Sequence, residues 1–271
     1  DNNKRAAWKV FYSNKQLFFV DLGSMKKYLF IVLLVGVGFG HDQKTILLSK
    51  LSTNKSNYNE YLINRSVGIH KIKGFDYIDS TIGIILVHGY YPENWDTKGF
   101  EWVEPILNLS KSGVPIWFYR YDWNECPLTI HDSMLKKLKT LIKLNEDLKS
   151  VVIIGHSFGG LITTLLSESW DSEFPIKTHA IATGLARINK NLNHKDCRNS
   201  KKDKYTIAPN VKYIQWVTIK HQDGIFKHLK QDPQKVEIIN GKRILLPKDY
   251  NGIRVGHNSS LLFVIDNFNR Y

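Results

Sequence analysis

Ser157 lies at the centre of a Gly-x-Ser-x-Gly motif, a spacing that can present a serine hydroxyl as a nucleophile. Four apolar residues, Val151 to Ile154, precede the motif and predict a buried strand of a parallel sheet. Apolar residues continue at helical spacing over 161–166. Strand, sharp turn and helix are the setting in which the motif has chemical meaning, because its glycines allow neighbouring backbone to come close. A chance match is the alternative, and the flanking elements argue against it.

A serine hydroxyl reacts slowly at neutral pH unless a base, most often a histidine, takes its proton. We predict that His257 is this base, because Gly256 precedes it and a polar stretch separates it from an apolar helix over 261–268. That context places it on a loop at the edge of a sheet. His88 and His156 belong to motifs of their own beside the site, and the other histidines have no such context.

A carboxylate should orient the base and stabilise its charged form. Asp223 follows a predicted strand and precedes Gly224, so we take it as the acid. Asp-Gly is also a common turn pair, which gives Asp223 a purely structural alternative. Asp122, which follows an earlier strand, is its main rival, and Asp232 and Asp249 are weaker candidates.

The chain has 271 residues and 42% hydrophobic content, enough for one large core. Predicted strands and helices alternate, which favours an α/β fold with a mostly parallel sheet and helices on both faces. Ligands of such sheets bind beyond the carboxyl ends of the strands, where every candidate above is expected. We expect an irregular lead-in over 41–61 and one or two edge strands over 61–77. The predicted strands are 82–87, 114–121, 151–155, 176–183 and 211–219, and the predicted helices are 100–112, 128–148, 161–169 and 261–268.

Over residues 82–268 the sequence resembles the lipase and esterase type of the α/β-hydrolase superfamily. The candidate nucleophile, acid and base follow one another in the order Ser, Asp, His that this family requires. The resemblance rests on four matches in the family's order: His88-Gly89, Gly155-His156-Ser157-Phe158-Gly159, Asp223-Gly224 and Gly256-His257.

The resemblance implies a serine hydrolase that cleaves carboxylic esters through an acyl-enzyme, with no metal and no organic cofactor. It also implies an oxyanion hole made by the backbone N–H groups of Phe158 and Tyr90. The chain has His-Gly-Tyr-Tyr where some esterases have His-Gly-Gly-Gly, so the match at Tyr90 is the looser one. Thioesterase, amidase or acyltransferase chemistry would use the same triad, and a catalytically silent binding scaffold is a further alternative.

The first 40 residues are predicted to be separate from the hydrolase domain of residues 41–271. Met25 and Lys26-Lys27 precede an apolar run over 28–39, and a small-x-small site ends it before His41. This layout is typical of a secretory signal peptide, and residues 1–24 are then upstream sequence. We therefore expect a secreted or extracytoplasmic protein cleaved near His41, with a membrane anchor at 28–39 as the alternative.

The net charge of +13 is partly clustered, with seven basic against two acidic residues between Arg187 and Lys204. This cluster lies in a long polar segment, 185–209, which we expect to be a lid or insertion. The expected partners are a small-molecule or lipid ester substrate and an anionic membrane surface, although a solvated basic surface without a partner is the simpler interpretation. No aromatic interleaving accompanies the charge, so no nucleic acid is expected.

Cys126 and Cys197 both follow predicted strands and could meet at one edge of the sheet. Outside the cytoplasm such a pair can form a disulfide. The sequence alone favours the other outcome, two free thiols.

Overall fold

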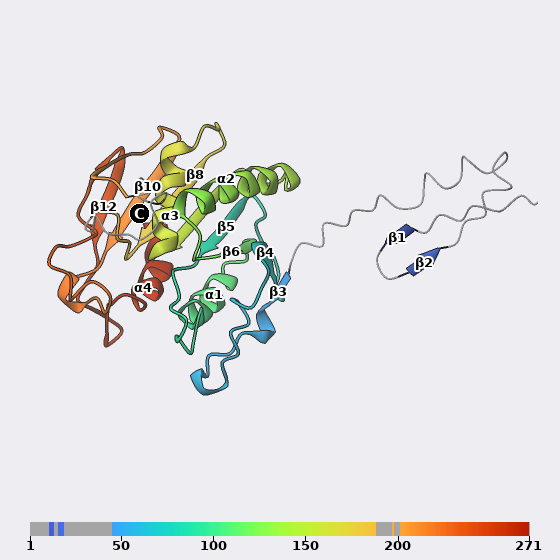
Figure 1. Ribbon diagram of the computed structural model, residues 1–271, viewed down its shortest axis with the longest axis horizontal. Coiled ribbons are helices and arrows are strands. Elements are labelled where there is room, and N and C mark those ends of the chain that lie inside the picture. Colours follow the sequence, from blue (N-terminus) through green and yellow to red (C-terminus); the bar gives the residue numbers. More distant parts are fainter. Residues whose placement is uncertain (1–10, 14–15, 19–44, 188–196, 198–200, 271) are drawn as a thin grey trace, which may run out of the picture. The chain divides into compact units, whose positions relative to one another are not determined.

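The computed structural model describes residues 11–13, 16–18, 45–187, 197 and 201–270 (Figure 1). The chain forms two compact units, 1–42 and 43–271. In the first, β1 (Phe11–Ser13) pairs antiparallel with β2 (Gln16–Phe18). The predicted signal or anchor at 28–39 and its cleavage site at His41 lie outside the described residues. Within the described ranges, no helix is long and apolar enough to cross a membrane.

The second unit is built on an eight-stranded sheet in the order β12-β10-β8-β7-β5-β6-β4-β3. The five strands from β10 to β6 run parallel to one another, and β4 runs antiparallel to β6. This is the mostly parallel sheet that the sequence predicts. The strands are β3 (Thr45–Leu47), β4 (Gly68–Lys73), β5 (Ile82–Val87), β6 (Ile116–Arg120), β7 (Ser150–His156), β8 (Ile176–Ile181), β10 (Val211–Val217) and β12 (Gly241–Leu245).

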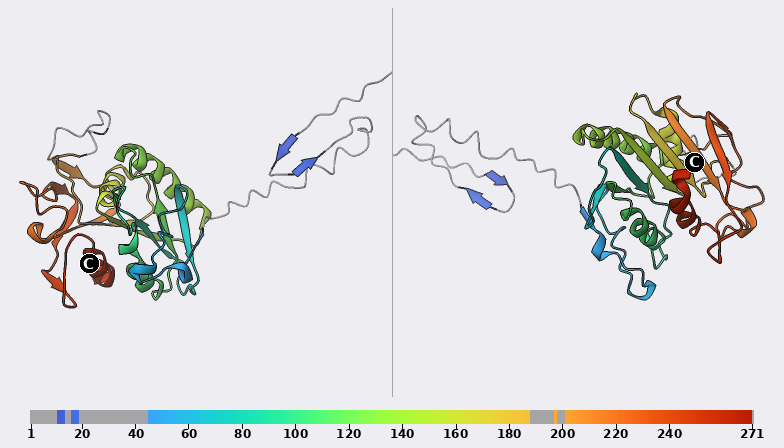
Figure 2. Two further views of the ribbon diagram at one scale, coloured as in Figure 1. Left: turned by 60° about the horizontal axis from the view of Figure 1, so that its bottom comes forward. Right: turned by 180° about the vertical axis from the view of Figure 1, so that it is seen from behind.

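Helices cover both faces of this sheet, as Figures 1 and 2 show. Strand β5 explains why, because its side chains alternate between two separate cores. Ile84 and Leu86 pack in the core beneath α1 and α4, while Ile85 and Val87 pack in the core beneath α2 and α3. Both faces are therefore apolar, as a parallel sheet between two helical layers requires. The helices are α1 (Val103–Ser110), α2 (Pro127–Leu144), α3 (Phe158–Ser169) and α4 (Ser260–Asn267).

Two edges of the sheet differ from the sequence prediction. The lead-in over 41–61 is not wholly irregular, because it contains β3, which pairs parallel with β4, and two single 3-10 turns, Leu48–Lys50 and Lys55–Asn57. At the other edge, β12 pairs parallel with β10 and was not predicted. It contains Lys242 and Arg243, which an edge strand tolerates because one side faces solvent.

The described part of the predicted insertion, 185–187, 197 and 201–209, is packed against the fold. Strand β9 (Lys204–Thr206) pairs parallel with β11 (Glu237–Ile239). Leu185 and Tyr205 are buried in a small cluster with Leu161 of α3. A further short pair, β13 (Asp249–Tyr250) and β14 (Ile253–Arg254), precedes the loop to α4.

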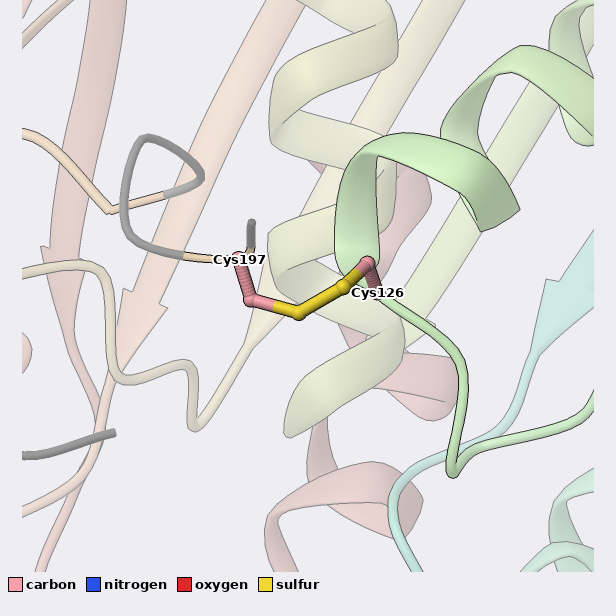
Figure 3. Close-up of a disulfide and its surroundings, with 2 residues drawn as sticks. All are labelled: Cys126 and Cys197. Carbon is pink, nitrogen blue, oxygen red and sulfur yellow. A yellow bond between two sulfur atoms is a disulfide. The ribbon is translucent and has the colours of Figure 1, made fainter. Parts of the chain in front are cut away.

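The expectation of two free thiols is wrong, because Cys126 and Cys197 form a disulfide with their Cα atoms 5.3 Å apart (Figure 3). Cys126 is the residue before α2, and Cys197 belongs to the insertion that follows β8. The two cysteines are 71 residues apart in the sequence. Only the parallel sheet, which brings the ends of β6 and β8 to the same edge, places them in reach of each other.

Three buried histidines make the fold sensitive to acid. Burial is the main cause that lowers the pKa values of His88, His156 and His179 to about 3. The unfolded chain binds protons at these residues below about pH 6.5, whereas the folded chain does not. Their contribution to stability is therefore complete above about pH 6.5 and is lost as the pH falls toward 3.

We predict that the free energy of unfolding decreases between about pH 6.5 and about pH 4, by about 1.4 kcal/mol per pH unit for each of these histidines. His179→Gln should flatten that slope, because it removes one of the three titrating imidazoles. The fold should persist, since the glutamine amide can still accept the hydrogen bond that the Trp216 indole donates to His179 Nδ1. Urea unfolding at several pH values measures the slope. The exposed His221→Gln is the matched control, and an unchanged slope in His179→Gln would contradict the prediction.

Candidate active site

Ser157 occupies the sharp turn between β7 and α3, in a backbone conformation that non-glycine residues seldom adopt. Its φ is 54° and its ψ is −118°. Such a conformation costs about 1–3 kcal/mol and persists only where the surroundings impose it. Hydrogen bonds hold both sides of the residue, from Ser157 N–H to the Ile181 carbonyl (2.8 Å) and from Gly160 N–H to the Ser157 carbonyl (3.0 Å). The turn therefore projects the hydroxyl beyond the carboxyl end of the sheet.

The glycines around Ser157 are required by close approach of the backbone. A Cβ on Gly155 would lie 2.6 Å from the carbonyl oxygen of Gly159. A Cβ on Gly159 would collide with the carbonyl oxygens of Val87 and His88, at the end of β5. A Cβ on Gly160 would collide with the Thr183 side chain. Helix α3 can therefore begin this close to β5 and β8 only without these side chains.

The three residues predicted as nucleophile, base and acid form one hydrogen-bonded chain. His257 Nε2 lies 2.9 Å from Ser157 Oγ, and His257 Nδ1 lies 3.0 Å from both carboxylate oxygens of Asp223. Ser157 follows β7, Asp223 follows the 3-10 turn Lys220–Gln222 after β10, and His257 precedes α4. Such a chain can move a proton from the serine hydroxyl to an imidazole whose charged form faces a carboxylate.

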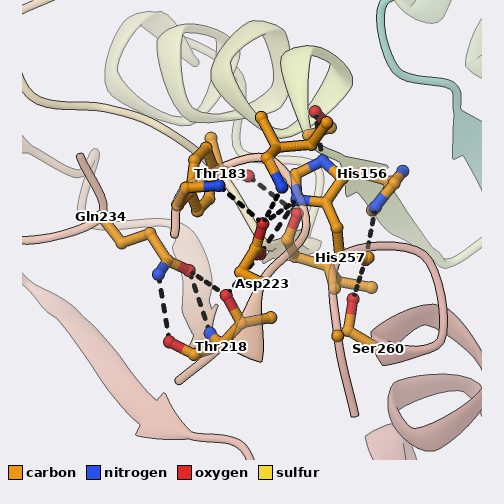
Figure 4. Close-up of polar contacts among 12 residues, drawn as sticks. His156, Thr183, Thr218, Asp223, Gln234, His257 and Ser260 are labelled. Atoms are coloured by element: carbon orange, nitrogen blue, oxygen red, sulfur yellow. Dashed lines mark hydrogen bonds and ion pairs between the residues drawn. The ribbon is translucent and has the colours of Figure 1, made fainter. Parts of the chain in front are cut away.

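Asp223 is fully buried and surrounded by donors (Figure 4). Its carboxylate accepts hydrogen bonds from the Thr218 hydroxyl (2.7 Å) and from the N–H groups of Ile225 and Phe226. Burial raises the pKa of this carboxyl, but the hydrogen bonds from His257, Thr218 and Phe226 outweigh it and leave the pKa below its usual value. Asp223 therefore fits both interpretations. Its carboxylate accepts the N–H groups of its own turn and also lies against His257 Nδ1.

His156 and Ser260 fix the backbone of His257 (Figure 4). The His257 carbonyl accepts hydrogen bonds from His156 Nε2 (2.9 Å) and from the Ser260 hydroxyl (2.6 Å). The Phe226 ring packs edge-on against the imidazole of His257, with ring centroids 5.1 Å apart. Burial, and next the nearby His257, lower the pKa of His156 to about 3, so His156 is a neutral donor and not a second base.

The two expected oxyanion donors, Tyr90 and Phe158, line one pocket with Ser157. Phe158 is the first residue of α3, so its N–H has no helical carbonyl to bind. The Gly89 carbonyl accepts a hydrogen bond from the buried His88 Nδ1 (2.7 Å). In a planar trans peptide the N–H points opposite to the carbonyl, so the Tyr90 N–H is directed away from His88. His88 thus orients one of the two expected donors.

The pocket around Ser157 measures about 250 Å³. Its walls are mostly aromatic and aliphatic, with one carboxyl, Glu101, and one ammonium, Lys201, among them. A second pocket of about 330 Å³ shares Trp95, Glu101 and Asn258 with the first. The site therefore has two adjoining compartments. The first pocket is also lined by Gly89, Tyr91, Pro92, Leu161, Gly184 and Ile225.

The rival acids lie elsewhere. Asp122 is exposed, and its carboxylate accepts a hydrogen bond from Asn124 N–H (3.0 Å) in the loop after β6. Asp232 accepts from Gln234 N–H in the same way, and Asp249 is exposed in β13. These three carboxylates serve local turns or face solvent.

A second Ser–His–Asp sequence of contacts joins α2 to α3. His131 Nε2 lies 2.6 Å from Ser169 Oγ, and His131 Nδ1 lies 2.9 Å from Asp132. Ser169, however, ends a regular helix, and the side chain of Asp132 is 78% exposed. Neither a strained turn nor a buried carboxylate is present here, so this contact ties two helices together. It is a control for the hydrogen-bonded triad at Ser157.

The sequence reasoning missed Thr218 and Gln234. The Gln234 amide accepts from Thr218 N–H (2.9 Å) and donates to the Thr218 carbonyl (3.1 Å), which fixes the residue that binds Asp223. Gln234 belongs to an irregular loop 16 residues from Thr218, and no local pattern in the sequence signals this pairing.

Comparisons with known proteins support the fold. No protein-family model matches the chain, and no curated protein matches its sequence. Among solved structures, Est1E from Butyrivibrio proteoclasticus is similar with a TM-score of 0.50 and 16% identity, over 71% of this chain and 86% of that one. A lipase-esterase related protein from Clostridium acetobutylicum has a TM-score of 0.50 and 10% identity, over 76% of this chain and all of the other.

These similarities, together with the sheet order and the turn at Ser157, show that the chain has the α/β-hydrolase fold. The resemblance noted in the sequence is confirmed at this level. Within the described part of the chain, no cluster of three or more His, Cys, Asp or Glu side chains is arranged to hold a metal.

Proposed function

We propose that the protein is a serine hydrolase that cleaves carboxylic esters through an acyl-enzyme intermediate. The observation that carries the proposal is the continuous chain from the strained Ser157 through His257 to the buried Asp223. Strain at a single serine, with a base and a buried acid in line, is an arrangement that structural packing alone does not require.

In this reaction Ser157 Oγ attacks the ester carbonyl carbon while its proton passes to His257 Nε2. The negative charge that develops on the carbonyl oxygen is stabilised by the N–H groups of Phe158 and Tyr90. His257 then returns the proton to the departing alcohol, and the acyl group remains on Ser157. Water, deprotonated by His257, repeats the sequence and releases the acid. Asp223 remains ionised throughout and stabilises the imidazolium.

Thioesters, amides and acyl acceptors other than water would use the same triad, so they remain alternatives within the proposal. They differ in the leaving group or in the acceptor, and rates on matched ester, thioester and amide substrates separate them. A silent binding scaffold is the alternative from another class, and a fluorophosphonate probe, which reacts with an activated serine, would fail to label it.

We predict that Ser157→Ala abolishes both ester hydrolysis and labelling by a fluorophosphonate while leaving the fold intact, because the change removes only the nucleophile. Asp223→Asn should lower kcat by about 10⁴-fold, since the productive imidazole tautomer loses its partner. Ester hydrolysis and gel-based labelling measure these effects, and circular dichroism reports on folding.

Ser169→Ala and Asp122→Asn are the matched controls for these two variants. Ser169 belongs to the helix-joining contact with His131, and Asp122 serves a local turn, so both variants should retain labelling and hydrolysis. If Ser169→Ala lost labelling while Ser157→Ala kept it, the roles assigned to the two serines would be reversed.

We also propose a preference for short and medium acyl chains. The pocket that holds Ser157 measures about 250 Å³, below the range of about 300–1,000 Å³ for ligand sites, and the adjoining pocket is not lined by Ser157 or His257. Each buried methylene is worth about 0.8 kcal/mol only where apolar surface receives it, and Lys201 interrupts that surface.

On a panel of p-nitrophenyl esters from acetate to palmitate, kcat/KM should peak at the short or medium chains. Emulsified triglyceride, run beside the panel, should give little hydrolysis and no activation at its interface. A rate that climbs steadily to palmitate, together with interfacial activation, would exclude this preference.

Finally, we propose that the protein acts outside the cytoplasm, after cleavage near His41 or while anchored by residues 28–39. The disulfide between Cys126 and Cys197 supports the proposal, because such bonds persist in oxidising compartments. N-terminal sequencing of protein recovered from expressing cells distinguishes the two cases, and a reduced protein found in the cytoplasm would contradict both.

A further inference from the structure

The pocket around Ser157 is lined by a basic side chain that has no role in the proposed reaction. Lys201 comes from the insertion after β8 and lines the same pocket as Ser157 and His257. Among the residues that the structure describes, no carboxylate lies within ion-pair distance of its ammonium group. Burial lowers the pKa of Lys201, because a desolvated ammonium group loses its hydration.

The neighbouring basic residues are engaged in other ways. Lys202 Nζ lies 2.8 Å from Glu168 on α3, and Lys204 Nζ lies 3.3 Å from Glu237 on β11. Arg187 Nε donates to the backbone carbonyl of Lys201 (3.2 Å). Among the basic residues of this cluster that the structure describes, Arg187, Lys202 and Lys204 therefore bind the protein itself, while Lys201 lines the pocket.

The segment that bears Lys201 is attached to the fold on both sides. Four residues before it, Cys197 is bonded to Cys126 at the start of α2 (Figure 3). One residue after it, the N–H of Lys202 donates to the Tyr205 hydroxyl (3.2 Å), which itself donates to the Leu185 carbonyl (3.0 Å). Cys197 before Lys201 and Lys202 after it are thus tied to the fold, so less ordering is needed when a ligand binds.

Glu101, the one acidic side chain among the described residues that line the pocket, does not form an ion pair with Lys201. Its carboxylate accepts a hydrogen bond from the Tyr91 hydroxyl, with 2.5 Å between the two oxygen atoms. Burial raises the pKa of Glu101 to about 7, against that hydrogen bond, and so favours its uncharged form. Within the described residues, Lys201 therefore lines the pocket without an ion pair to Glu101.

We propose that Lys201 is an anion-binding residue of the catalytic pocket and that the preferred ester carries a carboxylate or a phosphate on its acyl or its alcohol part. This inference rests on the proposed esterase function and specifies its substrate class. An anion that enters the pocket replaces the hydration that Lys201 has lost and forms a charge-assisted hydrogen bond with it. A neutral ester of equal size offers the ammonium no such partner.

Two pairs of substrates test the proposal and separate the two positions of the anion. Mono-p-nitrophenyl glutarate against p-nitrophenyl butyrate places a carboxylate on the acyl part, and 1-butyrylglycerol 3-phosphate against monobutyrin places a phosphate on the alcohol part. The variants are Lys201→Gln and Lys201→Glu. Lys204→Gln is the matched control, because Lys204 belongs to the same segment but pairs with Glu237 at the surface.

In at least one pair, we expect Lys201→Gln to lower kcat/KM for the anionic ester by about tenfold to a hundredfold. The rate on its neutral partner should stay within about twofold, since only the charged contact is removed. Lys201→Glu should reverse the preference, and Lys204→Gln should leave it unchanged. Equal losses on anionic and neutral esters, or no loss on either, would overturn the proposal.

A binding measurement keeps this test separate from the esterase proposal. Calorimetry on Ser157→Ala, with glutarate and glycerol 3-phosphate as ligands, does not depend on turnover. Adding Lys201→Gln to that protein should weaken binding of one of these anions by a similar factor. Unchanged binding would exclude the anion subsite even if the enzyme proves active, and weakened binding without any ester hydrolysis would exclude only the proposed reaction.

Discussion

The close approach of helix α3 to the ends of β5 and β8 is the constraint on which the rest of the site depends. Gly155, Gly159 and Gly160 have no side chains where carbonyl oxygens and Thr183 already occupy the space. Because the helix begins there, Ser157 must take a positive φ and its hydroxyl projects above the sheet. The cost of this conformation is offset by the two cores on either side of the sheet, which leave the turn no room to relax.

Around this turn, neutral histidines position other groups instead of exchanging protons. His88 holds the Gly89 carbonyl, and His156 holds the carbonyl of His257. Burial keeps both uncharged, so each imidazole has a defined donor nitrogen. As a consequence the fold loses stability in acid, because the two histidines bind protons in the unfolded chain and not in the folded one. Stability and site geometry are therefore linked through the same buried rings.

The insertion after β8 contributes a basic side chain, Lys201, to the lining of the pocket. Its disulfide, its short pairing with β11 and the buried Tyr205 attach it to the body of the fold. Without these attachments, we would expect a polar, basic segment to lie in solvent and not next to an apolar pocket. In the attached segment, Lys201 lines the same pocket as Ser157, so one of the basic residues counted in the sequence has a defined position.

The sequence by itself determined the elements that local patterns encode. The strand over 82–87 is found with the predicted bounds, and the motif at Ser157, Asp223-Gly224 and Gly256-His257 marked the three residues that meet. Hydrophobic periodicity and turn glycines act over a few residues, so they are legible without a structure.

Only the tertiary structure decided which distant residues are neighbours. It paired Cys126 with Cys197, brought Gln234 to Thr218 beneath Asp223, and added β3 and β12 to the edges of the sheet. It also distinguished Lys201, which lines the pocket, from Lys202 and Lys204, which pair with carboxylates. These contacts join segments far apart in the chain, and they exist only because parallel strands end at one edge and two cores fix the order of the sheet.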